Sequence, residues 1–215
     1  SVIGNGIDHE LYSKKNQNVA RNNLGVKSTK KIVIFGAMSA DSDLRKGFDL
    51  LSTAIPLTKS SFDVIMFGGK SKEIMTDDFG HKIFKLGHLD NEHSIIDAYS
   101  AADLMVVPSR EDNLPNTVIE ALMCSLPVVA FNIGGMPDMI KHEKNGYLAK
   151  PFQIADLAKG VDWIVKNPDY KLLAKNARSF AVNNYRLDVA TNGYLEIYKD
   201  VLTYKSQAKV NEIHN

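Results

Sequence analysis

Three carboxylates are grouped in the stretch PSREDNLPNTVIEALMC, which runs from Pro108 to Cys124. Glu111 and Asp112 fall in a polar segment that contains proline, and Glu120 falls one turn into a segment with helical spacing of apolar residues. A carboxylate at that point of a helix can accept hydrogen bonds from a pair of neighbouring hydroxyl groups, as a ribose presents. The stretch therefore has the composition of a binding site for a hydroxyl-rich ligand.

A pair of cations, Arg45 and Lys46, stands at the start of another predicted helix. Positive charges there are unfavourable by ~0.3–1 kcal/mol each, because the helix dipole is itself positive at the N-terminus. The pair is better explained if it meets an anion, since the amides of a helix start also bind phosphate. The alternative is a solvated basic turn whose charge is balanced by three nearby acids, Asp41, Asp43 and Asp49.

Each acid of the stretch also has a structural explanation. Thr117 and Glu120 have the spacing of a capping box, in which the acid returns to the amide of the N-cap residue. Loop acids such as Glu111 and Asp112 are individually more often solvated than functional. The combination of loop acids, a helix start and a basic pair at one sheet edge favours a binding site. Cys124, on the apolar side of the helix, is expected to fill the core rather than to act as a nucleophile.

The elements that must position these groups alternate between apolar runs and segments of helical spacing. Runs with the length and branching of strands lie at 32–36, 64–67, 83–87, 104–107, 128–131 and 146–148. Helices are expected at 47–57, 93–101, 117–125, 154–165, 168–185 and 187–204. Near-continuous apolar strands that alternate with helices predict an α/β fold, a Rossmann-like, doubly wound parallel sheet of about six strands with C-terminal helices.

Glycine closes three of the predicted strands, at Gly36, Gly68 and Gly87. In an open α/β sheet the ligand crevice lies outside the carboxyl ends of the strands. Glycine at these ends would allow the backbone to approach a ligand closely. The alternative for each one is that it only begins a tight loop.

The composition is that of an ordinary globular protein. The chain has 215 residues, of which 44% are hydrophobic and 24% charged, and a formal net charge of +1. This charge gives no reason to expect nucleic acid as a partner, and no apolar run approaches the ~20 residues that span a bilayer. The N-terminus does not have the pattern of a signal peptide. A single cysteine fits a reducing compartment, so we expect a cytoplasmic protein with one domain over 1–205 and a disordered tail over 206–215.

Several motifs follow one another in a fixed order along the chain. They are Val2-Ile3-x-Asn5-Gly6-Ile7-Asp8, Arg45-Lys46-Gly47-Phe48, Ala102-Asp103-x-x-x-x-Pro108-Ser109, the run from Glu111 to Ala121, Gly134-Gly135-Met136-Pro137-Asp138 and Asn145-Gly146. This succession, from residue 2 to about residue 200, resembles the C-terminal, donor-binding half of family 4 glycosyltransferases. The resemblance implies one half of a GT-B fold and a nucleotide-sugar binding domain over 1–205.

The resemblance also implies a retaining hexosyltransferase whose donor is a UDP- or GDP-linked sugar, with no metal ion and no further cofactor. Lys46, helped by Arg45, would bind the diphosphate in place of Mg²⁺. Asp112 and Glu120 have the spacing of the family's paired acids, so Asp112 would bind hydroxyls of the transferred sugar and Glu120 the ribose. The other implied donor-binding residues are Gly36, Gly68, Leu86, Gly87, Glu111, Asn113, Leu114, Pro115, Asn116 and Thr117.

Two departures from the family pattern affect the first acid and the first loop. The first acid is usually Glu, whereas here it is Asp112, which is one methylene shorter and follows Glu111. Which of the two reaches the sugar stays open at this point. The family also commonly has Gly-Arg in the first loop, whereas Gly36 is followed by Ala37-Met38. We hypothesise that Arg45 supplies the missing charge from the other end of that loop.

The acceptor, a glycan or a lipid-linked sugar, would be bound by an N-terminal half that precedes Ser1. The fragment alone is expected to bind the donor without turnover, and any contact with the inner membrane face would occur through that other half. The alternatives are a sugar-nucleotide epimerase of GT-B fold and a non-catalytic nucleotide-binding module. An oxidoreductase domain is disfavoured, because no G-x-G-x-x-G motif follows a predicted strand.

Overall fold

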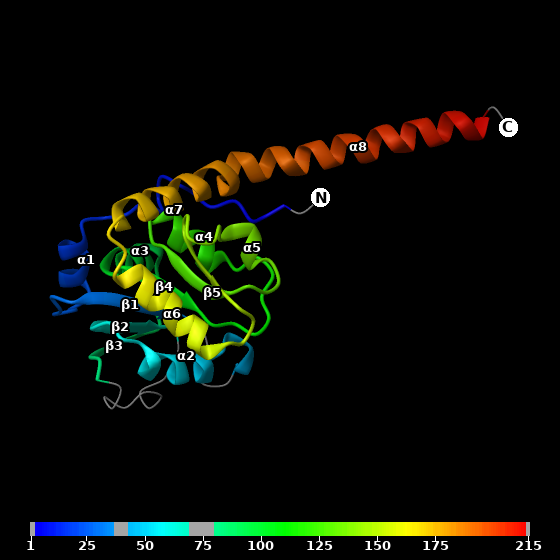
Figure 1. Cartoon of the computed structure of the whole chain (residues 1–215). Helices are drawn as coiled ribbons and strands as arrows, with labels where there is room; N and C mark the ends of the chain where they lie inside the picture. Colours follow the sequence, from blue (N-terminus) through cyan, green and yellow to red (C-terminus); the bar gives the residue numbers. More distant parts are fainter. Residues whose placement is uncertain (1–2, 37–42, 69–79, 214–215) are drawn as a thin grey trace.

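The computed structural model describes residues 3–36, 43–68 and 80–213, with side chains up to Tyr204. In this part of the chain, six parallel strands form one sheet in the order β3-β2-β1-β4-β5-β6 (Figure 1). Their bounds are β1 Lys31–Gly36, β2 Phe62–Phe67, β3 Ile83–Gly87, β4 Leu104–Val107, β5 Val128–Phe131 and β6 Gly146–Ala149. The strand order reverses direction beside β1, as in dinucleotide-binding folds, and the predicted Rossmann-like α/β fold is confirmed.

Helices cover both faces of the sheet. Helices α1, α3, α4 and α7 pack together on one face, and α2 and α6 pack on the other. The bounds are α1 Gln17–Asn23, η1 Leu44–Lys46, α2 Phe48–Ala54, η2 Ile55–Leu57, α3 Glu92–Ala101, α4 Asn116–Met123, α5 Met136–Met139, α6 Ile154–Val165, α7 Tyr170–Tyr185 and α8 Leu187–Ile213. The result is a three-layer domain in which helices cover both faces of the sheet.

Alternate residues of each strand enter two separate cores. In β1, Ile32 and Ile34 pack in the core beneath α3 and α4, whereas Val33 and Phe35 pack in the core beneath α2 and α6. All four side chains are at most 2% exposed. Because both faces are buried, the strands have no polar face, which explains the continuous apolar runs in the sequence.

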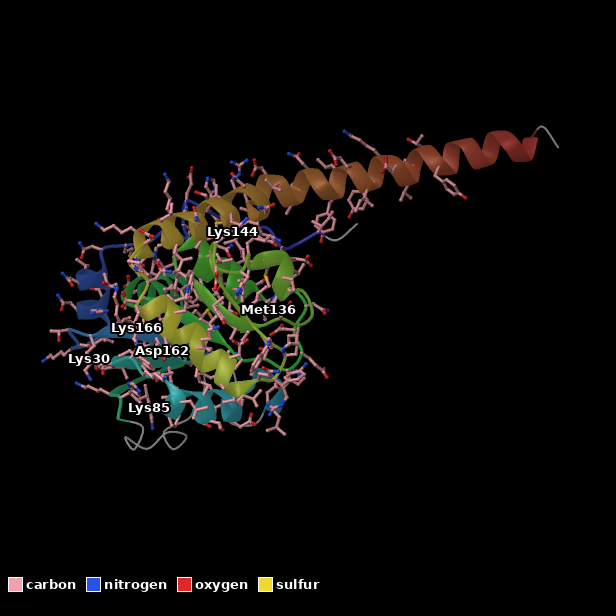
Figure 2. All side chains as sticks on the ribbon, in the orientation of Figure 1. Lys30, Lys85, Met136, Lys144, Asp162 and Lys166 are labelled. Carbon is pink, nitrogen blue, oxygen red and sulfur yellow. The ribbon has the colours of Figure 1, made fainter. Side chains whose placement is uncertain are left out.

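Most charged side chains lie on the outside of this domain, although Arg21, Asp63, Asp97 and Asp103 are buried. Figure 2 shows Lys30 and Lys85 at its periphery, whereas Met136, which is fully buried, lies inside it. The labelled Asp162 of α6 also has a structural role, since its carboxylate accepts the amide of Lys59 at 2.8 and 3.0 Å. That contact ties the connection between η2 and β2 to α6.

The predicted strands agree with the observed ones within two residues at each end, but three helical details differ. Helices α1 and α5 are too short to produce a clear periodic pattern, and α5 begins with Met136-Pro137. The sequence predicts that the last helix ends near Tyr204, whereas α8 continues to Ile213. Residues 194–213 contain neither glycine nor proline to end the helix. The disordered tail expected over 206–215 stays a prediction.

Helix α8 leaves the body of the domain and extends away from it, from orange to red in Figure 1. Besides Tyr204, five large apolar side chains on its outer part are at least 44% exposed: Tyr194, Leu195, Tyr198, Val201 and Leu202. Their spacing gathers them on one side of the helix. None of the described helices has both the length and the apolar sequence that crossing a membrane requires.

Candidate functional site

Lys46 and Asp112 meet at the carboxyl edge of the sheet. The Nζ of Lys46 lies 3.0 Å from Oδ2 of Asp112, and the two side chains are 33% and 15% exposed. The hydroxyl of Ser109 donates a second hydrogen bond to the same carboxylate oxygen at 3.1 Å. The structure thus brings together a cation that follows β1 and an acid that follows β4, as the sequence predicts for one edge of a parallel sheet.

The two loops that carry this pair are in direct backbone contact. Gly47 has a φ of +67°, and a Cβ there would lie 1.9 Å from the carbonyl oxygen of Pro108. The amide of Arg110 donates to the carbonyl of Arg45 at 2.7 Å, and its guanidinium binds both carboxylate oxygens of Asp49 at 2.6 and 2.8 Å. Sequence reasoning missed Arg110, because nothing in the local pattern shows which distant residue it will meet.

Arg45 is turned toward a different acid. Its guanidinium binds both carboxylate oxygens of Asp43 at 2.8 and 3.0 Å, and its side chain is 68% exposed. The Asp43 hydrogen bonds raise the pKa of Arg45, and the charges of Glu111 and Asp112 add to that effect. Arg45 is therefore close to the acidic loop without contacting Asp112, and the basic pair divides between two acids.

The loop from Asp112 to Leu114 rests on a pair of glycines that precede α5. A Cβ at Gly134 would lie 2.0 Å from the carbonyl oxygen of Asp112, and one at Gly135 would lie 1.8 Å from that of Asn113. The amide of Gly135 donates to the carbonyl of Asp112 at 3.3 Å. The backbone of the acidic loop is thus fixed by close packing that no side chain could replace. Glu111 and Asn113 are exposed on this loop, whereas Leu114 is half-buried.

Helix α4 begins directly after this loop, with Pro115 as its N-cap and no side-chain cap. Thr117 is the second helical residue rather than the N-cap, so the capping-box explanation of Glu120 is wrong. Glu120 Oε2 instead accepts a hydrogen bond from the hydroxyl of Tyr99 at 2.9 Å. Asn116, at the helix start, accepts a hydrogen bond from the side chain of Asn5 at 2.9 Å.

Burial dominates the electrostatics of Glu120. It raises the pKa of this carboxyl, the hydrogen bond from Tyr99 lowers it, and the charge of Glu92 raises it further. Cys124, one turn later, is buried in the core, and burial raises the pKa of its thiol to about 12. Glu120 is therefore the ionisable group of α4 that is suited to bind a ligand, while Cys124 packs in the core.

The three strand-end glycines share the same edge. Gly68 and Gly87 have φ values of +99° and +68°, and the amide of Gly68 donates to the carbonyl of Gly87 at 2.7 Å. Gly36 faces the ring of Phe67, which a Cβ would meet at 2.3 Å, whereas a Cβ at Gly87 would meet open space. Leu86 is half-buried and packs against the core. Ala37, Met38 and Asp41 lie outside the described residues.

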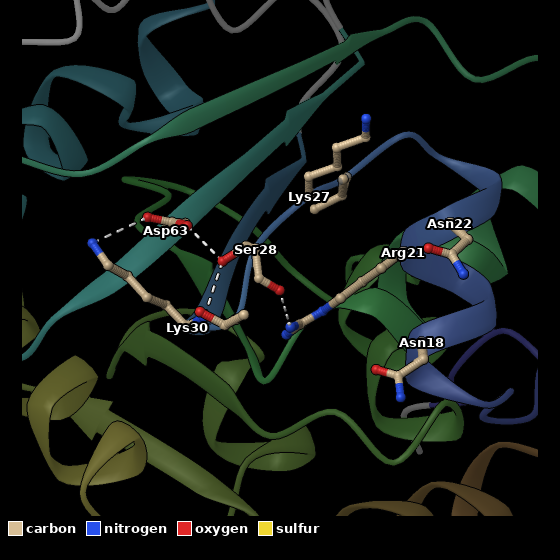
Figure 3. Close-up of a pocket in the computed structure, with 9 residues that line it drawn as sticks. Asn18, Arg21, Asn22, Lys27, Ser28, Lys30 and Asp63 are labelled. Carbon is tan, nitrogen blue, oxygen red and sulfur yellow. Dashed lines mark hydrogen bonds and ion pairs between the residues drawn. The ribbon is translucent and has the colours of Figure 1, made fainter.

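A large cavity lies at the opposite edge. It has a volume of about 640 Å³ and lies between α1 and the amino ends of β1 and β2 (Figure 3). Three of its charged groups already have protein partners: Arg21 binds Asp103 and two carbonyls, and Asp63 binds Ser28 and Lys30. This cavity is therefore separate from the edge that carries Lys46 and Asp112. Within the described residues, no three His, Cys, Asp or Glu side chains gather as metal ligands.

Comparisons with known proteins agree with this fold. A family model described as "Glycosyl transferases group 1" matches residues 16–180. An uncharacterized glycosyltransferase of Methanocaldococcus jannaschii is 27% identical over 213 residues, which cover 92% of this chain and 53% of that protein. The chain thus spans about half the length of this relative.

Two solved structures share the fold. HepE of Anabaena, in complex with UDP and glucose, superposes with a TM-score of 0.78 at 23% identity, over 93% of this chain and 56% of that one. The C-terminal domain of a glycosyl transferase group 1 family protein from Francisella tularensis gives a TM-score of 0.71 at 19% identity, over 85% of this chain and 100% of that one. The architecture is that of one half of a GT-B fold, and the family model matches residues 16–180, which are most of this chain. The chain therefore belongs to the group 1 glycosyl transferases.

Proposed function

We propose that this chain is the C-terminal, donor-binding half of a retaining, family 4 glycosyltransferase that moves a hexosyl unit from a UDP- or GDP-linked sugar. The observation that carries the proposal is the contact between Lys46 and Asp112, which joins the cation after β1 to the acid after β4. The UDP and glucose bound by the structural neighbour HepE support a nucleoside diphosphate sugar as the ligand. Neither UDP nor GDP is favoured over the other by a particular contact.

In this proposal, Lys46 stabilises the diphosphate as it leaves. A cation fixed at the point where negative charge develops lowers the barrier most when it is partly shielded from water, as Lys46 is. The amides around the start of α4, which has no side-chain cap, add partial positive charge beside it. No metal ion is then required to neutralise the leaving group.

The two acids hold the sugars. Asp112 binds hydroxyls of the transferred hexose, and its ion pair with Lys46 holds the carboxylate in place before the donor arrives. Glu120 binds the hydroxyls of the ribose from the first turns of α4. Glu111 is exposed on the same loop and belongs to its outer surface, so we assign the first acid of the pair to Asp112.

The acceptor, a glycan or a lipid-linked sugar, binds to an N-terminal half. This is supported by the share of the relative that the chain spans, and by the exposed apolar side of α8, which that half would cover. The isolated chain is then expected to bind the donor and to transfer nothing. Transfer of sugar by the chain alone would contradict this part of the proposal.

The proposal is tested by calorimetric titration of the chain with UDP, GDP, ADP and NAD. We expect binding of UDP or GDP and none of NAD, and Lys46→Ala should weaken the binding roughly 10- to 100-fold, because it removes a charge-assisted hydrogen bond. Lys144→Ala, at an exposed lysine away from this edge, is the matched control and should change nothing. Equal affinities for all four ligands, or no effect of Lys46→Ala, would contradict the proposal.

The role of Arg45 is tested in the same way. If Arg45 supplies the charge that the family carries in its first loop, it must leave Asp43 to reach the diphosphate. Arg45→Ala should then weaken UDP binding as well, by less than Lys46→Ala does. Unchanged affinity in Arg45→Ala would leave Lys46 as the sole phosphate cation of the two.

A further inference from the structure

Tyr99 is a fully buried residue of α3 whose hydroxyl reaches the second acid of the site. It is 0% exposed, and its hydroxyl donates to Glu120 Oε2 at 2.9 Å. Burial, followed by the charge of Glu120, raises the pKa of this hydroxyl well above its usual value, so it stays a donor at any ordinary pH. Nothing in the spacing of the sequence indicates this contact, because the two residues lie on different helices.

The ring of Tyr99 is held by aromatic packing that ends at the sheet edge. It meets Phe67 edge-to-face, with ring centroids 5.9 Å apart. Phe67 in turn lies over Gly36, where a Cβ would meet its ring at 2.3 Å. A buried aromatic packed in this way has one rotamer available, so its hydroxyl has one position.

We propose that Tyr99 is a positioning residue, which fixes the carboxylate of Glu120 so that its remaining acceptor sites face the ribose of the donor. The inference rests on the proposed function of Glu120. An ionised carboxylate has about four acceptor sites, and Tyr99 uses one of them. Two neighbouring hydroxyls of a ribose can use others, provided that the carboxylate is held at a fixed angle.

The burial of Glu120 explains why such a partner is needed. A carboxylate withdrawn from water and left without a donor takes up a proton or turns outward, and in either state it binds hydroxyls less well. Burial and the charge of Glu92 on α3 raise the pKa of Glu120, and the hydrogen bond from Tyr99 lowers it. Tyr99 thus favours the ionised form of the acid and holds it aligned.

The experiment compares the affinities of UDP and 2′-deoxy-UDP for the whole chain and three variants. The wild-type chain should prefer UDP, Glu120→Gln should lose most of the preference, and Tyr99→Phe should reduce it by about tenfold or less, since a buried hydrogen bond to a charged group is lost. Tyr170→Phe is the matched control. It also removes a tyrosine hydroxyl, bonded to the carbonyl of Asp103 at 2.8 Å, but away from this edge, and it should keep the full preference.

A double variant keeps the test decisive if Tyr99→Phe also loosens the fold. Because Tyr99 acts only through Glu120, adding Tyr99→Phe to Glu120→Gln should reduce the preference no further. Two results would overturn the positioning role and leave the proposed function intact. One is a double variant that loses more of the preference for UDP over 2′-deoxy-UDP than Glu120→Gln does. The other is a Tyr99→Phe variant that keeps the full preference when Glu120→Gln has lost it. Full preference in Glu120→Gln itself would overturn the ribose role of Glu120, and with it that part of the proposed function.

Discussion

At the scale of single residues, the ion pair between Lys46 and Asp112 dominates the electrostatics of the carboxyl edge of the sheet. In the free chain the ammonium is partly neutralised by the carboxylate, at 3.0 Å. A diphosphate must therefore share Lys46 with Asp112. This arrangement suits a site that binds the whole nucleotide sugar more tightly than the nucleotide alone, because the sugar hydroxyls engage the acid.

Asp112→Asn should consequently change the affinity for UDP and the affinity for UDP-glucose by different factors. With the competing charge removed, UDP should bind roughly 2- to 5-fold more tightly at low salt, as expected for a half-exposed ion pair. The preference for UDP-glucose over UDP should fall, because the acid no longer accepts the sugar hydroxyls. Calorimetry with both ligands measures this. Asp188→Asn, which removes an exposed partner of Arg186, is the control. Weaker binding of UDP in Asp112→Asn would contradict the neutralisation described above.

Glu120 carries the clearest pH dependence. Its pKa in the fold is raised, mainly by burial, so the folded state holds the proton more strongly than the unfolded chain does. Stability therefore falls as the pH rises from the ordinary value of this carboxyl through its folded value, and the loss is complete above both. Glu120→Gln does not titrate and keeps an acceptor for Tyr99.

We thus expect Glu120→Gln to have a higher free energy of unfolding than the wild type at pH 7. The difference should shrink as the pH is lowered toward 4.5, the ordinary pKa of the group. Urea unfolding at several pH values measures both quantities. A variant less stable than the wild type at pH 7 would mean that the hydrogen bond, rather than burial, dominates at this position.

At the scale of elements, the donor edge depends on backbone packing between loops. Gly135 has an ordinary φ of −87°, so only space, and not strain, forbids a side chain there. Gly135→Ala would push its methyl group against the carbonyl of Asn113, 1.8 Å away. We expect a loss of about 1–3 kcal/mol in stability and weaker UDP binding, since the loop before α4 must move.

Gly193→Ala provides the control for that substitution. Its methyl group would meet only the flexible end of Ile3, at 3.1 Å, and alanine favours a helix over glycine by up to about 1 kcal/mol. Chemical unfolding and calorimetry should show stability and UDP affinity unchanged or higher in this variant. Equal effects of the two substitutions would show that the loop is not fixed by Gly135.

The sequence predicts the sheet well because the pattern that indicates a strand, a run of apolar residues, lies within the strand itself. The central strands are buried on both faces, and each is recognised directly as an apolar run such as Leu104–Val107. The edge that carries Lys46, Asp112 and Glu120 follows from the parallel order of the strands. The site's supporting contacts are not local, and they depend on the final packing of distant elements.

Arg110 and Arg178 illustrate that limit. Arg110 meets Asp49 from another loop, and Arg178 on α7 donates to carbonyls of His9, Tyr12 and Met123 on two different segments. No spacing rule relates these residues in the chain. The predicted end of the last helix, near Tyr204, falls short of Ile213 for another reason, because a polar composition does not end a helix that lacks glycine and proline.

At the scale of the whole molecule, α8 is the helix that extends beyond the packed body of the domain. Its outer part extends from the body with an exposed apolar side (Figure 1). Deleting residues 194–215 should change the free energy of unfolding of the isolated chain by less than about 0.5 kcal/mol, since the side chains of 194–204 are largely exposed. Urea unfolding of the two forms measures it. A loss of several kcal/mol would show that this segment belongs to the core of the domain.

The central claim is that one nucleoside diphosphate sugar contacts both Lys46 and Glu120 at the carboxyl edge of the sheet. A crystal structure of the chain with bound UDP tests it most directly. We predict a diphosphate oxygen within roughly 2.7–3.2 Å of Lys46 Nζ and the ribose hydroxyls on Glu120. A nucleotide bound instead in the cavity between α1 and the amino ends of β1 and β2, or one with its ribose away from Glu120, would contradict the claim.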